Sequence, residues 1–304
     1  MVLPGSERLF ASTGMSAFLV VGAGFKHAPA LAFEVKMILE AIILGIVQGL
    51  TEFLPISSSG HLILAQWATG WTGELMNNLT FDVALHVGTL VAVLWYFRQD
   101  WLRLGKASLN ALRGKAPAHE ARFVWYLAFA TIPAAILGMR YERVVETAFR
   151  DPLLVAAALV AGSLIIWLAD HYSSQERRLA SMTIGHSFFV GMAQAIALIP
   201  GISRSGITIS AGLAMGYRRE DAARFSFLLS TPVIAGAAVF KLKHLSLHSG
   251  DAALGFVLGT LSAAIVGYLA IRFLIRYLER HSMNIFVWYR LVLAAGVVLL
   301  WAAR

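Results

Sequence analysis

Residues 48–61 read QGLTEFLPISSSGH, and they follow the run MILEAIILGIV at residues 37–47. Such an apolar run is typical of a membrane helix. Within a few residues it leads into a carboxylate, a proline, three serines, a glycine and a histidine. Inside a bilayer each of these polar groups is costly unless a function uses it. The stretch therefore predicts a helix that breaks at membrane depth, with polar groups placed there for a purpose.

The composition agrees with a membrane protein. Of 304 residues, 58% are hydrophobic and 14% are charged, whereas a soluble domain has about 25% charged residues. The mean hydropathy is +0.70. The chain has no cysteine, which excludes disulfides, thiolate metal sites and cysteine-based phosphatase chemistry. The net charge of +8 is explained by basic cytoplasmic loops. Because no basic stripe is interleaved with aromatic residues, we expect no nucleic-acid partner.

Eight apolar segments divide into two kinds. Six are unbroken and long enough to cross a bilayer: 81–97, 122–140, 153–170, 223–242, 252–277 and 285–303. The other two, 37–69 and 184–216, are each interrupted by a polar turn, LPISSSGH in the first and IPGISRSGIT in the second. A broken helix at membrane depth is tolerated only where protein buries it or a cavity opens beside it. We therefore predict two re-entrant hairpins of half-helices.

The two interrupted segments also resemble each other. GIVQGLTEFLPISSSG from Gly45 aligns without gaps on GMAQAIALIPGISRSG from Gly191. Ser58 of the first turn falls on Arg204 of the second. Identical residues occupy both members of the following pairs: Gly45 and Gly191, Gln48 and Gln194, Ile56 and Ile202, Ser57 and Ser203, Ser59 and Ser205, Gly60 and Gly206. The sequence thus predicts an internal repeat.

Counting the crossings gives the topology. Each repeat holds one hairpin and three full spans, and an odd number of spans makes the second repeat start on the opposite side of the membrane. The prediction is an inverted repeat, whose hairpins meet near the midplane. Basic residues gather near 98–122, 177–178, 218–224 and 272–280, which places those loops in the cytoplasm. Residues 70–80 and the C-terminus are then outside.

The predicted fold is an all-α polytopic membrane protein with six transmembrane helices and two re-entrant hairpins. Repeat 1 covers residues 37–170 and repeat 2 covers 171–304. Residues 1–36 do not fit the repeat. Their apolar piece AFLVVGAGF is too short to span a bilayer, and APALA offers small residues for cleavage. We expect an extension that is either signal-like or loosely attached.

Polar groups converge on the two predicted hairpin tips. Gln48 and Glu52 are four residues apart and share one face of a helix. Each group has an ordinary explanation: an ion pair of Glu52 with Arg204, helix caps at the serines, a buried partner for His61. Together, however, an arginine, serine hydroxyls and two half-helix N-termini form an anion site, and phosphate is the obvious anion. A divalent cation, Mg²⁺ or Ca²⁺, would let Glu52 face a phosphate.

QGLTEFLPISSSGH and PGISRSGIT resemble the two signature motifs of the bacterial undecaprenyl-diphosphate phosphatases, the bacitracin-resistance proteins. The resemblance covers nearly all of residues 37–304. It implies hydrolysis of undecaprenyl diphosphate to undecaprenyl phosphate, which recycles the carrier lipid for peptidoglycan synthesis. It also implies a polyisoprenyl diphosphate as substrate, a divalent metal, the bacterial inner membrane, a site open to the periplasm and a homodimer.

The resemblance carries over to residues one at a time. Glu52, Ser58 and His61 match the acidic residue, serine and histidine of the first motif, and Ser203, Arg204 and Thr208 match the second. We expect catalytic roles for Glu52, Ser58, His61 and Arg204, and phosphate contacts from Ser57, Ser59, Ser203, Arg204, Ser205 and Thr208. Gln48 stands where many relatives have glutamate, and it is expected to share a metal with Glu52. Tyr289 is expected at a membrane interface, and Arg290 has no assigned role.

Two questions stay open in the sequence. Either Ser58 attacks as a nucleophile with His61 as its general base, or His61 activates a water and Ser58 binds phosphate. In addition, an inverted repeat with broken helices is the architecture of many secondary transporters. A transporter or lipid flippase that uses the same residues is therefore the alternative function.

Overall fold

The computed structural model describes residues 35–69, 79–114, 119–148, 151–242 and 253–304. The predicted extension lies outside these ranges, apart from residues 35 and 36, which begin the first described helix at 35–53. The later elements are α2 (Ser58–Thr69), α3 (Leu79–Tyr96), α4 (Arg98–Leu112), α5 (His119–Ala148), α6 (Pro152–Tyr172), the short 3₁₀ helix η1 (Leu179–Ser181), α7 (Ile184–Ile196), α8 (Arg204–Ala214), α9 (Arg219–Leu242), α10 (Ala253–Leu278) and α11 (Asn284–Ala302). The described chain is thus helical throughout, as predicted.

Five of these helices are long and apolar enough to cross a membrane: residues 120–141 of α5, α6, residues 219–240 of α9, α10 and α11. Each coincides with a predicted span. The sixth predicted span, 81–97, falls on α3, which qualifies only in combination with α4. The prediction of a polytopic all-α membrane protein is confirmed.

The segment after α3 differs from the expectation of a basic loop. It folds as α4, which bends away from α3 by 74°. Trp101, Leu104, Ser108 and Ala111 are among its better-buried residues, and their spacing of three and four marks one face of a helix. The basic residues lie on the other face. The basic character of this segment was therefore recognised from the sequence, but the helix that its buried residues form was not.

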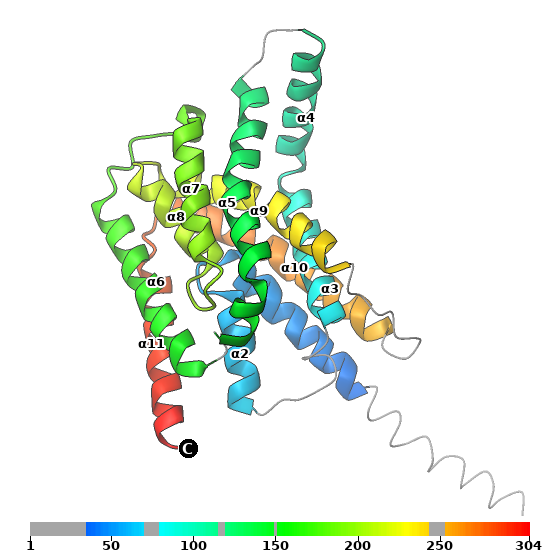
Figure 1. Ribbon diagram of the computed structural model, residues 1–304, viewed down its shortest axis with the longest axis vertical. Helices are drawn as coiled ribbons and strands as arrows, with labels where there is room; N and C mark the ends of the chain where they lie inside the picture. The colour runs from blue at the N-terminus through cyan, green and yellow to red at the C-terminus, as the bar shows by residue number, and fades with distance from the viewer. Residues whose placement is uncertain (1–34, 70–78, 115–118, 149–150, 243–252) are drawn as a thin grey trace, which may run out of the picture.

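Both interrupted segments are broken at the predicted turns. The first helix ends at residue 53 and α2 begins at Ser58, while α7 ends at Ile196 and α8 begins at Arg204. In Figure 1 the first pair occupies the lower part of the molecule and α7 and α8 the upper part, and the two turns approach each other near the centre. The two broken segments therefore extend toward opposite ends of the helical bundle from the point where their turns approach.

The two repeats also pack alike at their first glycines. Gly45 lies so close to α10 that an added Cβ would be 2.3 Å from the carbonyl oxygen of Gly259. Gly191 lies equally close to α5, where the carbonyl oxygen of Ala130 would be 2.4 Å away. Small residues allow helices to approach closely where no hydrophobic effect drives association. Each interrupted segment thus packs closely against one long helix of the other repeat.

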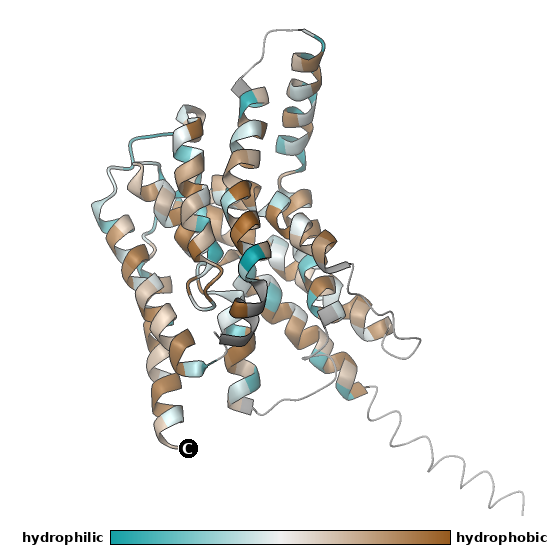
Figure 2. Cartoon of the chain, viewed as in Figure 1, coloured by the Kyte–Doolittle hydropathy of each residue, from teal (hydrophilic) through white to brown (hydrophobic). Residues whose placement is uncertain are grey.

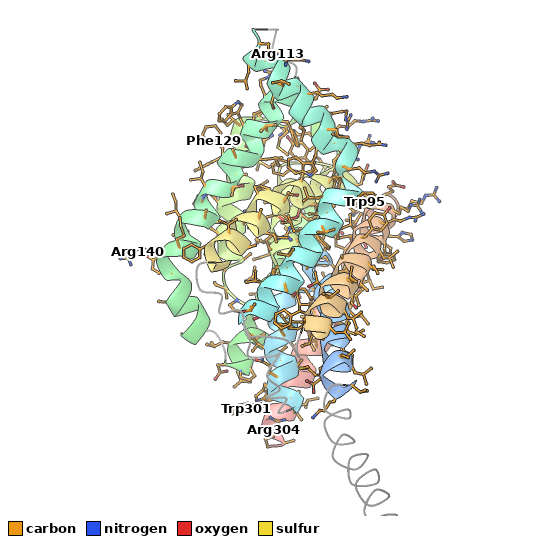
Figure 3. The ribbon with its side chains drawn as sticks, turned by 90° about the vertical axis from the view of Figure 1, so that its right-hand side faces the viewer. Trp95, Arg113, Phe129, Arg140, Trp301 and Arg304 are labelled. Carbon is orange, nitrogen blue, oxygen red and sulfur yellow. The ribbon has the colours of Figure 1, made fainter. Side chains whose placement is uncertain are left out.

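Apolar side chains cover the outside of the bundle. Figure 2 shows hydrophobic residues along the length of α6 and α11, where Leu164 is 55% and Leu299 71% exposed. Apolar surface of this extent marks contact with lipid rather than water. Figure 3 places Arg113 at one end of the molecule and Trp301 and Arg304 at the other. The segment predicted to be cytoplasmic and the C-terminus therefore lie at opposite ends.

Candidate active site

The two hairpin tips are in direct contact. The hydroxyl of Ser57 accepts a hydrogen bond from the backbone N–H of Gly201, 3.1 Å away. In the other direction, the hydroxyl of Ser205 donates to the carbonyl of Leu54 at 3.0 Å. Residues from the two repeats are therefore joined across the centre of the molecule.

The same serine turn forms both tips. Ser57 and Ser203 have φ angles of 77° and 78°, a region that residues other than glycine rarely adopt. The strain is offset by capping, because each hydroxyl accepts the N–H of the glycine three residues later, at 3.3 Å for Gly60 and 3.1 Å for Gly206. These caps direct the N-termini of α2 and α8 to the region between the tips, where their dipoles favour an anion.

Arg290, from α11, holds the two tips together. It is fully buried. One guanidinium nitrogen, Nη1, donates to the carbonyls of Pro55 and Ile202 at 3.2 and 3.1 Å, and Nη2 donates to that of Gly201 at 2.8 Å. Its Nε donates to the hydroxyl of Ser163 at 3.0 Å. A single side chain thus satisfies carbonyls of both broken helices, which have no helical partner at this depth.

Glu52 lies at the centre of a network that spans the tips. Its Oε1 is 2.9 Å from Nη2 of Arg204, and both side chains are largely buried. Its Oε2 accepts hydrogen bonds from the Ser58 hydroxyl at 2.9 Å and from Nε2 of Gln48 at 3.1 Å. Carboxylate, hydroxyl, amide and guanidinium groups from both repeats therefore meet within hydrogen-bond distance.

His61 lies one helical turn beyond this network. Its Nδ1 is 2.7 Å from the carbonyl oxygen of Ser57, and its Nε2 is 2.7 Å from the hydroxyl of Tyr289. Both ring nitrogens are thus occupied, and Ser58 is bonded to Glu52 instead. The expected pairing of Ser58 with His61 is replaced in this arrangement by pairing with the carboxylate.

Comparison with known proteins identifies the family of this chain. The family model of the bacitracin resistance protein BacA matches residues 41–296. The chain belongs to the BacA family. An undecaprenyl-diphosphatase of Moorella thermoacetica is 50% identical over 268 residues, 88% of this chain and 99% of that protein. Another, from Pelotomaculum thermopropionicum, is 46% identical over 267 residues, 88% of this chain and 98% of that protein.

The structure brings the predicted residues of this BacA-family chain to the tips, but in different settings. Glu52, Ser58 and Arg204 form the network itself. Ser57, Ser203 and Ser205 are buried and engaged in capping or in joining the tips, whereas Ser59 is exposed. Thr208 is buried, and its hydroxyl is 2.6 Å from that of Ser226 on α9. Their predicted phosphate contacts stay predictions.

Three polar partners were missed in the sequence: Ser226, Tyr289 and Arg290. Ser226 gave no signal, because a lone serine in an apolar span is common. An arginine within a span is rare and usually functional, so Arg290 could have been singled out. Tyr289, next to it, could then have been considered as more than an interface anchor.

The donor set at the tips fits a divalent cation only if a phosphate shares it. Among the described residues, no group of three or more His, Cys, Asp or Glu side chains could hold a metal ion. The amide oxygen Oε1 of Gln48, however, is buried without a hydrogen-bond partner, next to the Glu52 carboxylate. Mg²⁺ commonly takes one or two protein oxygens and completes its shell with water and phosphate. Gln48 and Glu52 suit that mode.

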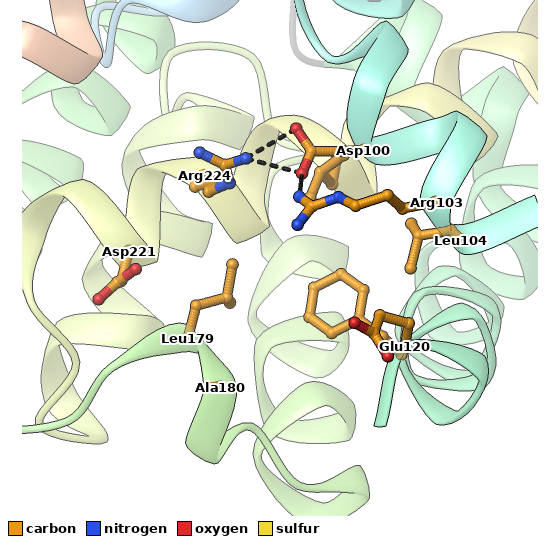
Figure 4. Close-up of a pocket in the computed structure, with 10 residues that line it drawn as sticks. Asp100, Arg103, Leu104, Glu120, Leu179, Ala180, Asp221 and Arg224 are labelled. Carbon is orange, nitrogen blue, oxygen red and sulfur yellow. Dashed lines mark hydrogen bonds and ion pairs between the residues drawn. The ribbon is translucent and has the colours of Figure 1, made fainter. Parts of the chain in front are cut away.

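Away from the tips, a polar cavity of about 400 Å³ lies between α4, α5, η1 and α9 (Figure 4). Asp100 accepts hydrogen bonds there from Arg224, at 2.7 Å to each carboxylate oxygen, and from Arg103. No serine, threonine or histidine is among the residues that line it. Its guanidinium groups are already paired with a carboxylate, so the cluster fixes α4 to α9.

Proposed function

We propose that this chain is a membrane phosphatase that hydrolyses undecaprenyl diphosphate to undecaprenyl phosphate and inorganic phosphate. The observation that carries the proposal is the Ser58 hydroxyl bonded to Glu52, which is itself paired with Arg204 from the other tip. A nucleophile, a base and a phosphate-binding cation are thereby assembled at one point. The names of the relatives, undecaprenyl-diphosphatases, support the substrate. Family membership supports carrier-lipid recycling for peptidoglycan synthesis and bacitracin resistance.

Substrate binding would change the partner of Arg204. The guanidinium fork matches two phosphate oxygens as well as it matches a carboxylate, and a diphosphate carries more charge than Glu52. When Arg204 turns to the terminal phosphate, the Glu52 carboxylate loses its strongest electrostatic partner and becomes a better base. The N-termini of α2 and α8 add fixed partial positive charge at the same point. Binding would therefore activate the site.

In the first chemical step, Oγ of Ser58 attacks the terminal phosphorus and its proton passes to Oε2 of Glu52. The bond between that phosphorus and the bridging oxygen breaks, and undecaprenyl phosphate leaves with the bridging oxygen. In the second step, the Tyr289 hydroxyl turns away from Nε2 of His61, water attacks the phosphoserine and gives a proton to that nitrogen, and Ser58 regains its proton from Glu52. Direct attack by a water that His61 activates is the alternative. A trapped phosphoserine at Ser58 supports the first route.

A divalent cation held by Glu52 and the amide oxygen of Gln48 would neutralise charge on the diphosphate and so favour its approach to the carboxylate. The preference for oxygen ligands applies to Mg²⁺ and Ca²⁺ alike. The buried and unpaired Oε1 of Gln48 supports this proposal.

We also propose the placement of the protein in the bacterial inner membrane. The two hairpins would be re-entrant, and the active site would open toward the periplasm. The end-to-end separation of Arg113 and Arg304 supports this orientation, since the basic α4 segment favours the cytoplasm. The family resemblance further implies a homodimer, which the mass of the purified protein in detergent would test.

A lipid flippase is the alternative function, because hairpins that enter from opposite ends are typical of transporters. Transport alone would give no use to a serine hydroxyl bonded to a carboxylate beside an arginine. Hydrolysis is therefore the function that the network favours, with any lipid movement secondary to it.

The decisive experiment measures phosphate release from undecaprenyl diphosphate by the purified protein in lipid-supplemented detergent. We expect release with Mg²⁺ or Ca²⁺ and little with EDTA. Glu52→Gln and Arg204→Lys should each lower kcat/KM by about 10²-fold or more, because Gln cannot take a proton and Lys lacks the planar fork.

The matched controls are Glu176→Gln and Arg178→Lys, both at exposed positions, and they should retain parental activity. Absence of phosphate release from folded parent protein would overturn the proposal and favour transport. Full activity in EDTA would overturn only the proposed requirement for a divalent cation.

A further inference from the structure

His86 lies on α3, within the predicted span 81–97, and takes no part in the contacts described above. Its Nδ1 is 2.7 Å from the carbonyl oxygen of Asp82, one turn earlier. A carbonyl can only accept a hydrogen bond, so Nδ1 carries the proton. Nε2 has no hydrogen-bond partner among the described residues. An ionisable side chain inside a span is costly unless a partner or a function engages it, so this half-buried imidazole is a candidate ligand contact.

Close packing on α10 places His86 beside the first described helix. Gly49 of that helix and Gly88 of α3 both lie against Ala263: an added Cβ would be 2.8 Å from its carbonyl oxygen at Gly49 and 3.0 Å from its Cβ at Gly88. Gly49 directly follows Gln48, and Gly88 lies two residues after His86. His86 is therefore at about the depth of Gln48 in the bundle.

The face of α3 that carries His86 is turned toward the tips. Phe97 lies eleven residues later, which is close to three full turns, so the two residues share a helix face. The ring centroid of Phe97 is 6.4 Å from that of Phe227 on α9, and the Phe227 centroid is 5.5 Å from that of Phe53. Phe53 adjoins Glu52, whose carboxylate also experiences a coulombic attraction from His86. His86 therefore belongs to the surroundings of the Glu52 network.

A phosphate oxygen is the ligand that suits this nitrogen. Imidazoles and phosphates titrate in the same pH range, so a phosphate oxygen and Nε2 can share one proton in a hydrogen bond. Mg²⁺ and Ca²⁺ prefer oxygen ligands and suit an imidazole less well. Glu52 and Arg204 are assigned to the terminal phosphate. At the depth of Gln48, His86 lies about one helical turn from Glu52, toward the end of the bundle that holds the C-terminus (Figure 1).

We propose that His86 is a substrate-binding residue, whose Nε2 forms a hydrogen bond with the phosphate that stays on the lipid. The inference rests on the phosphatase proposed above. That phosphate is present in both undecaprenyl diphosphate and undecaprenyl phosphate, so His86 should strengthen the binding of substrate and product alike. Its effect should accordingly appear in binding more than in the chemical step.

The test compares two replacements that retain different parts of the imidazole. The amide of asparagine reaches the position of Nδ1, and the amide of glutamine reaches that of Nε2. His86→Asn should raise KM for undecaprenyl diphosphate by about tenfold and leave kcat within about threefold, because it removes one hydrogen bond to a charged group before and during the reaction. His86→Gln should keep KM within about threefold of the parent value.

The matched control is His281→Asn. His281 is exposed, and its Nδ1 is 3.1 Å from the carbonyl oxygen of Tyr277, four residues earlier. It thus has the same local contact as His86 without the neighbouring tips, and its replacement should leave KM unchanged. Thermal unfolding in detergent should give a parental Tm for all three variants, which establishes that they are folded.

A second readout does not depend on turnover. The Kd of undecaprenyl phosphate for the protein in lipid nanodiscs should rise about tenfold in His86→Asn and stay within about threefold in His86→Gln. Parental KM and Kd in His86→Asn would overturn the inference, while the active parent upholds the phosphatase. Equal losses of kcat in both variants would also overturn it, because they would indicate proton transfer, which neither amide performs. An inactive parent would overturn the phosphatase and the inference with it, before any variant is compared.

Discussion

The two hairpin tips have the same backbone conformation but different reactive side chains. Ser57 and Ser203 adopt the same left-handed conformation and cap α2 and α8 in the same way. Yet the position held by Ser58 in the first tip is Arg204 in the second, and the position of His61 is Ile207. The repeated turn thus has the same backbone conformation in both tips, while Ser58 provides the proposed nucleophile in one tip and Arg204 the phosphate-binding cation in the other. The site exists only where the two tips meet.

The largest expected effect comes from removing the hydroxyl of Ser58 in the first tip. Ser58→Ala should lower kcat by about 10³-fold or more if Ser58 is the nucleophile, because the covalent intermediate forms on its hydroxyl. Phosphate release and phosphoserine trapping measure the outcome, with the exposed Ser181→Ala as control. A loss of less than tenfold would transfer the attack to a water activated by His61.

A smaller effect should separate the two capping serines. Ser57→Ala and Ser203→Ala each remove a helix cap, which should destabilise the protein by about 1–2 kcal/mol. Ser57 also accepts the N–H of Gly201, so its replacement should cost about 1 kcal/mol more. Thermal unfolding in detergent should therefore give the lower Tm for Ser57→Ala. A lower Tm for Ser203→Ala would show that the hydrogen bond from Gly201 to Ser57 adds no stability.

The smallest effect should distinguish the two repeated glutamines. Gln48 donates to Glu52 at 3.1 Å, whereas neither amide atom of Gln194 has a hydrogen-bond partner within the described residues. Gln48→Leu should lower kcat/KM by about tenfold and weaken the response to Mg²⁺, since it removes one hydrogen bond and one oxygen ligand.

Gln194→Leu is its matched control. It should leave activity within about twofold and keep or raise Tm, because it removes a buried polar group that lacks a partner. Equal losses of activity in the two variants would mean that Gln48 acts through packing alone.

The sequence was sufficient for much of this arrangement. Apolar length gave the spans, and the polar interruptions gave both breaks. The repeated ISxSG turn predicted that the two tips correspond, and the pairing of Glu52 with Arg204 followed from two opposite charges at those tips. Each of these conclusions depends on local pattern, on repetition or on the cost of an unpaired charge in lipid.

The remaining features depend on distant contacts. No local pattern shows that Arg290 reaches Pro55, or that the hydroxyl of Tyr289 reaches His61. The sequence suggested His61 as the partner of Ser58 because they are three residues apart, but at the start of α2 the Ser58 hydroxyl turns back to Glu52 in the preceding helix. Spacing along one helix could not anticipate a partner across the break.

The bonds made by Arg290 also bear on the order in which the protein matures during synthesis. The two tips are made early and midway along the chain, but the guanidinium that ties them belongs to α11, the last described helix. A nascent chain that has inserted only its earlier helices lacks this tie. Insertion of α11 would thus be the event that completes the site, so a nascent chain that lacks this helix would be inactive in the membrane.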